Sequence, residues 1–97
     1  MISQRMLSTL EERWRERGFS CELWVDGPGQ IWADFTHPTD EVVMVVRGEV
    51  EFEFGGTQHR PALGQELLIP AGVNHTVRNL GRGQAEWLYG YRRADAV

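Results

Sequence analysis

The sequence predicts an all-β protein: a small antiparallel β-sandwich or β-barrel that follows one short N-terminal helix. Apolar residues recur at helical spacing only before Gly18, and after it they alternate with polar residues in short runs. Turns rich in glycine and proline separate these runs. The 97 residues suffice for one packed core and not for two. We therefore expect a barrel domain at residues 19–97, with a helix at residues 1–18 packed on its outside.

The N-terminal segment has the pattern of an amphipathic helix. Residues 8–11 have the spacing of a capping box, and Leu7, Leu10 and Trp14 lie at helical intervals. Gly18 stands where such a helix would end, because glycine readily adopts the left-handed conformation that closes helices. The apolar side of this helix would pack on the barrel or, alternatively, on a partner subunit.

The segments after Gly18 read as short strands. Extended segments are predicted at 19–25, 30–37, 41–47, 50–54, 67–70, 75–79 and 86–91. The pair Gly55-Gly56 is typical of a hairpin turn, from which residues 57–61 lead to a further turn at Leu63-Gly64. Short strands, frequent turns and little helix after residue 18 favour a small antiparallel sandwich or barrel.

The composition argues against several classes of partner. Ten Lys and Arg against fourteen Asp and Glu give a net charge of −4, whereas a nucleic-acid surface needs clustered positive charge. No apolar run approaches the length needed to cross a bilayer. The single Cys21 can form no intramolecular disulfide, which fits a reducing compartment. Charged residues such as Arg5 and Glu11 interrupt the apolar run that a signal peptide at the N-terminus would need. We expect a cytoplasmic protein that binds neither nucleic acid nor membranes.

Two histidines and a glutamate are the strongest candidates for a functional site. His37 and Glu41 are four residues apart, but Pro38 and the β-branched run after Glu41 favour a tight bend between two strands over a helix. His37 would then end one strand and Glu41 would begin the next, whose inward face continues through Val43. His75 opens another strand after its own Pro-Gly turn. Two imidazoles and a carboxylate that converge would suit a divalent first-row metal.

Two stretches of the sequence resemble the paired motifs of the cupin superfamily. The second motif of that family is Gly, five residues, Pro, one residue, Gly, two residues, His, three residues and Asn, and residues 64–79 match every position. The first motif runs from a His-x-His pair through Glu to Gly, and here Phe35, His37, Glu41 and Gly48 occupy those four positions. The resemblance implies a jelly-roll-like cupin barrel, commonly assembled as a homodimer.

The resemblance also implies a metal site with one departure from the family pattern. Carried over, the metal ligands would be His37, Glu41 and His75, while Phe35 stands where the family has its remaining histidine. In one interpretation a divalent ion (Zn, Fe, Mn or Ni) binds the three residues and keeps open positions for water and substrate. In the other, the metal has been lost, and Phe35 fills the gap with apolar surface.

Aromatic residues are candidates for the wall of a ligand pocket. The barrel segment is rich in them: Trp24, Trp32, Phe35, Trp87, Tyr89 and Tyr91. We expect Trp32, Phe35, Trp87 and Tyr89, together with the inward-facing Val43, to line the pocket. Trp87 and Tyr89 share one face of the last strand, where they would stack on a small organic substrate or build the core and a dimer interface.

These residues suggest functions of different kinds. The first is a metal-binding barrel that takes up a small organic molecule beside the metal, as a dioxygenase, an isomerase or a decarboxylase would. The second is a metal-poor barrel that binds or senses a small ligand without catalysis. A purely structural dimer is the third. Because one barrel serves many chemistries, the sequence identifies no catalytic residue and leaves the reaction open.

Overall fold

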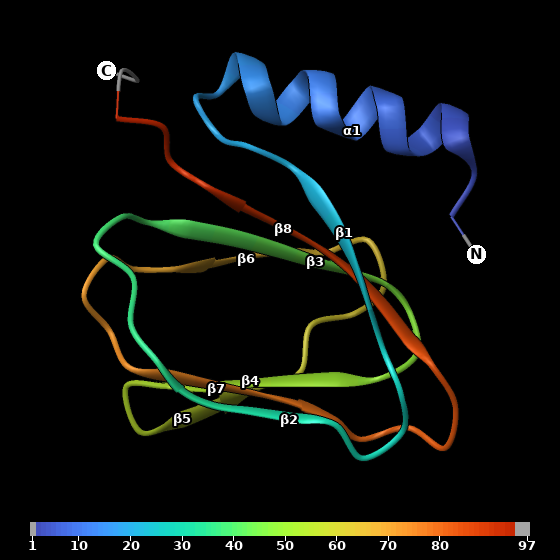
Figure 1. Ribbon diagram of the computed structural model, residues 1–97, viewed down its shortest axis with the longest axis vertical. Coiled ribbons are helices and arrows are strands. Elements are labelled where there is room, and N and C mark those ends of the chain that lie inside the picture. The colour runs from blue at the N-terminus through green and yellow to red at the C-terminus, as the bar shows by residue number, and fades with distance from the viewer. Residues whose placement is uncertain (1, 95–97) are drawn as a thin grey trace.

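The computed structural model describes residues 2–94 and consists there of two four-stranded antiparallel sheets and one helix (Figure 1). The elements are α1 (Gln4–Glu16), β1 (Glu22–Asp26), β2 (Ile31–Phe35), β3 (Glu41–Arg47), β4 (Val50–Phe54), β5 (Thr57–His59), β6 (Glu66–Ile69), β7 (His75–Asn79) and β8 (Ala85–Tyr91). The first sheet has the order β1-β8-β3-β6 and the second the order β2-β7-β4-β5. The two sheets face each other in the jelly-roll-like arrangement that the sequence predicted.

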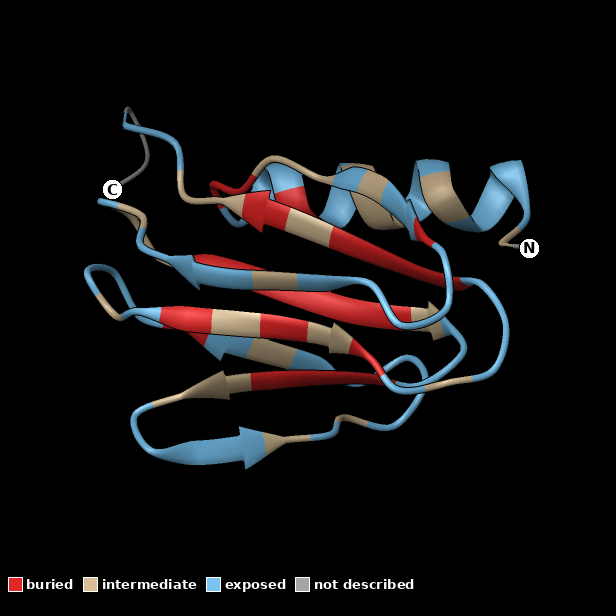
Figure 2. Ribbon diagram, turned by 60° about the horizontal axis from the view of Figure 1, so that its bottom comes forward, coloured by how far each residue is buried: buried red, intermediate tan, exposed pale blue. Residues whose placement is uncertain are grey.

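Burial is concentrated in the two central strands of each sheet. Figure 2 shows buried residues along β3 and β8 and along β4 and β7, while the edge strands carry few. The predicted inward face of β3 is confirmed, because Val43 and Val45 belong to the core cluster between the sheets. Val42 and Met44 point the other way and join a second cluster around Trp14 of α1. The first sheet is therefore covered on both faces.

The helix begins earlier than the predicted capping box at residues 8–11. Its N-cap is Ser3, whose side chain accepts a hydrogen bond of 3.1 Å from the backbone N–H of Met6. The extra turn is favourable because apolar residues ahead of residue 8 also pack against the cluster around Trp14. The indole N–H of Trp14 donates to Glu66, which ties α1 to β6. No helix of residues 2–94 is long and apolar enough to span a membrane.

The turn between β4 and β5 and the contact of β8 with the chain before β1 both depend on glycine. Gly55 and Gly56 join β4 to β5 with φ values of +60° and +75°, as the predicted hairpin turn needs. Gly90 lies on β8 where the chain leading into β1 crosses it, and a methyl group there would collide with the carbonyl oxygen of Ser20. The close approach of these two segments depends on the missing side chain.

β2 contains a bulge. Its register against β7 shifts by one residue between Trp32 and Phe35, so that Ala33 and Asp34 lie opposite Thr76. Asp34 adopts a φ of +60°, and its backbone N–H donates to the hydroxyl of Thr76. In a regular strand, residues three apart would face opposite sides. Because of the bulge, Trp32 and Phe35 both face the space between the sheets.

Candidate functional site

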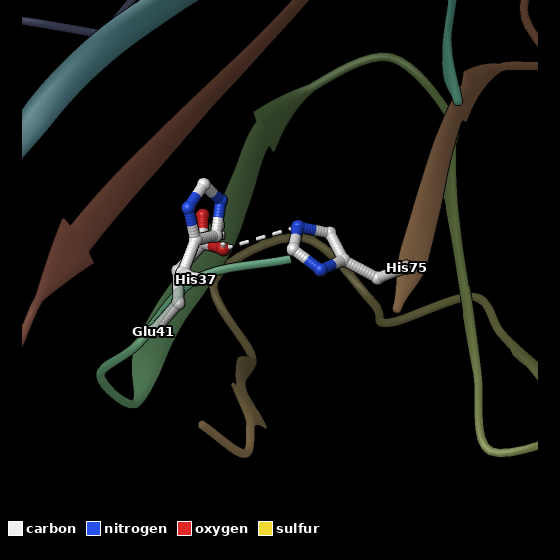
Figure 3. A group of neighbouring side chains, drawn as sticks. All are labelled: His37, Glu41 and His75. Atoms are coloured by element: carbon white, nitrogen blue, oxygen red, sulfur yellow. Dashed lines mark ion pairs between the residues drawn. The ribbon is translucent and has the colours of Figure 1, made fainter. Parts of the chain in front are cut away.

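His37, Glu41 and His75 lie together, and each offers a ligand atom within 4.8 Å of the others (Figure 3). As predicted, Glu41 opens β3 of the first sheet and His75 opens β7 of the second. His37 lies in the connection between β2 and β3 and not at a strand end, because β2 already stops at Phe35. Pro38 lacks an N–H group, so a paired strand cannot continue regularly through residue 38.

Two hydrogen bonds join the loops that carry the histidines. The backbone N–H of Gly72 donates to the carbonyl of His37 at 2.8 Å. The backbone N–H of Ala71 donates to the carboxylate of Asp40, also at 2.8 Å. Gly72 has a φ of +78°, a conformation that favours glycine. The two sequence motifs are thus bonded directly to each other, which fixes His37 beside His75.

Glu41 occupies the centre of the group. Its Oε1 lies 3.4 Å from Nε2 of His75 and 3.7 Å from Nε2 of His37. The residue is only 4% exposed, and this oxygen has no hydrogen-bond partner among the described residues. Burial raises the pKa of Glu41 to about 7. A buried carboxylate oxygen without a donor is destabilising, and a cation between the three side chains would relieve that penalty.

The two imidazoles are oriented by other groups. Nδ1 of His75 lies 3.2 Å from the carbonyl oxygen of Val73. A carbonyl only accepts, so Nδ1 carries the proton and Nε2 is left to bind a cation. Nε2 of His37 lies 3.3 Å from the hydroxyl of Tyr91. Burial, followed by the nearby His75, lowers the pKa of His37, which favours its neutral form.

A pocket of about 250 Å³ adjoins the three residues. Besides them it is lined by Trp24, Trp32, Phe35, Val77, Trp87, Tyr89 and Tyr91. Four of the five residues proposed from the sequence lie on this wall, whereas Val43 is fully buried in the core. Val77 was missed, although its alternation with His75 on β7 could have indicated it. A larger depression of about 890 Å³ beside α1 and Glu66 contains none of the three clustered residues.

Comparison with known proteins identifies the family. Residues 22–91 match the family model for the Cupin domain. The chain belongs to the cupin family. The matched segment includes His37, Glu41 and His75.

Two curated relatives of this cupin come from Streptomyces. Protein SchB of Streptomyces halstedii is 35% identical over 63 residues, which are 64% of this chain and 46% of that protein. Polyketide synthase CurC of Streptomyces cyaneus is 32% identical over 63 residues, which are 64% of this chain and 41% of that protein. The matched segment thus spans less than half the length of either relative.

Solved structures share the fold of this cupin. A Cupin 2 conserved barrel domain protein from Salinispora arenicola superposes with a TM-score of 0.69 at 22% identity, over 79% of this chain and 65% of that chain. A likeness at this level of identity concerns the arrangement of the strands.

Proposed function

We propose that this cupin binds a divalent first-row metal ion through His37, Glu41 and His75, and a small organic molecule in the aromatic pocket beside it. The observation that carries the proposal is Oε1 of Glu41, which is buried between two imidazole nitrogens without a hydrogen-bond donor among the described residues. Two histidines and one carboxylate suit iron in particular, and Zn, Mn and Ni accept the same donor atoms.

The residues around the ion would have different roles. When bound, a metal of this kind supplies Lewis-acid or oxygen-activating chemistry. Glu41 provides the negative charge, and the carbonyl of Val73 orients the imidazole of His75. Burial raises the pKa of Tyr91 to about 12, so its hydroxyl keeps its proton at neutral pH. That hydroxyl, close to His37, is placed to donate a hydrogen bond to an oxygen atom of the organic ligand.

The nature of the organic ligand is supported by the pocket and by one relative. Aromatic side chains make up most of the wall, which favours a carbon-rich molecule. Because one relative is a polyketide synthase, polyketide-derived molecules are the first compounds to test. A dioxygenase, an isomerase or a decarboxylase would each use this arrangement. Incubation under oxygen and under argon separates the first from the other two, since only the dioxygenase consumes oxygen.

A metal-poor barrel that binds or senses a ligand without catalysis is the second candidate function. Phe35 favours it, because this residue pairs with His75 across β2 and β7 and is 40% exposed on the pocket wall. Its ring centroid lies 6.2 Å from that of His75 and 6.3 Å from that of His37. An apolar ring at this distance disfavours a hydrated ion.

Elemental analysis and metal titration distinguish the two functions. We expect about one equivalent of Zn²⁺, Fe²⁺, Mn²⁺ or Ni²⁺ per wild-type chain after reconstitution, and a large loss in the variant His75→Ala. His59→Ala is the matched control, because that imidazole stacks on Phe54 and does not belong to the cluster. Binding of less than about a tenth of an equivalent by the wild type would overturn the metal proposal and favour the metal-poor barrel.

A further inference from the structure

We propose that Asp26 is a positioning residue that holds three tryptophans as one wall of the pocket and so selects flat aromatic ligands. The inference rests on the proposed ligand site. Asp26 ends β1 and is 3% exposed. Its Oδ1 accepts hydrogen bonds from the indole N–H groups of Trp24 at 2.7 Å and Trp32 at 2.9 Å. Its Oδ2 accepts one from Trp87 at 3.1 Å.

This arrangement joins the two sheets through one carboxylate. Trp24 lies on β1 and Trp87 on β8 of the first sheet, whereas Trp32 lies on β2 of the second. A buried carboxylate is usually stabilised by a cationic side chain, but here indole N–H groups take that role. All three tryptophans line the pocket. Because their N–H groups are already bonded, the rings present π faces and C–H edges to a ligand.

The chemistry of this wall indicates the class of ligand. Trp24 meets Trp32 edge to face, with centroids 5.6 Å apart and an interplanar angle of 76°. Such rings stack well on another flat ring and poorly on a puckered aliphatic one. No arginine is among the residues that line the pocket, so the proposed metal would be the only cationic partner there for a negatively charged group of the ligand. The adjoining histidines and their proposed metal disfavour a cationic ligand. A flat aromatic molecule without a positive charge, such as a phenol, is therefore the class of ligand that suits this wall.

Asn79, the last residue of the second motif, supports the backbone that carries Asp26. Its side-chain amide donates to the carbonyls of Gly27 at 2.8 Å and Gly83 at 3.0 Å. Its side-chain oxygen accepts from the N–H of Gly81 at 2.9 Å. Asn79 thereby joins the turn after β1 to the turn before β8. Because Gly27 directly follows Asp26, the motif asparagine helps to fix the position of the tryptophans.

The variant Asp26→Asn tests the inference. Asparagine keeps the shape of the side chain, but its NH₂ group cannot accept, so at least one indole N–H loses its partner. The probes are 2-naphthol and decahydro-2-naphthol, which share one skeleton and differ in flatness, and their binding is measured by calorimetry. We expect the wild type and the control Glu12→Gln, an exposed helix position, to prefer the flat probe by about tenfold or more. Asp26→Asn should lose this preference and keep its metal affinity.

The outcomes separate this inference from the proposed function. If the wild type binds metal and has equal affinity for the two probes, the proposed selectivity for flat ligands is wrong, while the proposed metal site is supported. If Asp26→Asn loses affinity for both probes to the same extent, Asp26 has only a general structural role, and this result would also contradict the inference. A wild type that binds neither metal nor probe would instead refute the proposed function. If Asp26→Asn does not fold, Trp24→Phe removes one N–H and keeps a flat ring. The preference of Trp24→Phe for 2-naphthol over decahydro-2-naphthol should be smaller than that of the wild type. An unchanged preference would contradict the inference.

Discussion

Replacing Glu41 with glutamine should remove a pH dependence of stability that the metal-free wild type shows. Burial raises the pKa of Glu41 from 4.5 to about 7. Between these pH values the folded protein keeps the proton while the unfolded chain releases it, so the free energy of unfolding falls as the pH rises. A shift of this size corresponds to about 3 kcal/mol. Glutamine cannot ionise, and the variant should avoid this loss.

Urea denaturation in the presence of a chelator measures the effect, with unfolding free energies compared from about pH 4.5 to about pH 8. Subtracting the unfolding free energies of the wild type from those of Glu41→Gln at each pH cancels the contributions of ionisable groups that both proteins retain. We expect similar stabilities at the acidic end and a variant that is more stable by about 3 kcal/mol at the alkaline end. Added metal should reverse this order, because only the wild type supplies a carboxylate. If the unfolding free energies of the two proteins change with pH in parallel in the absence of metal, the raised pKa of Glu41 is refuted.

Three further predictions concern the metal and the packing. Phe35→His should raise metal affinity by about tenfold or more in competition with a chromogenic chelator, because residue 35 pairs with His75; unchanged affinity would favour the metal-poor barrel. Saturating the wild type with metal should raise its melting temperature by about 10 °C, and calorimetry that shows no shift would contradict the metal site. Gly90→Ala should lower the free energy of unfolding in urea by about 2 kcal/mol or more, because the methyl group meets the carbonyl of Ser20. The control Gly83→Ala faces open space, and equal effects of the two variants would disprove the packing argument.

The fold and the position of the three clustered residues could be predicted because their signals are local. The turns at Pro70 and Gly72 and the β-branched run in Glu41–Arg47 depend on neighbouring residues alone. The family motif added the expectation that His37 and Glu41 would meet His75.

Other parts of the site depend on contacts between distant segments. The bulge in β2 places Asp34, and not a glycine, at positive φ, so the sequence carries no usual sign of it. Asp26 reads as the first residue of a turn, and its bond to Trp87 spans 61 positions. Such a contact exists only once the two sheets have packed, and no periodicity in the sequence records it.

The bulge in β2 also affects the outer edge of the second sheet. β2 is an edge strand, and such strands expose unpaired N–H and C=O groups on which another chain can add. The register shift at Ala33 and Asp34 interrupts the regular spacing of these groups. An incoming strand would therefore fail to form a continuous ladder along this edge. The irregularity that turns Phe35 toward the pocket thus also disfavours the addition of a further strand at this edge.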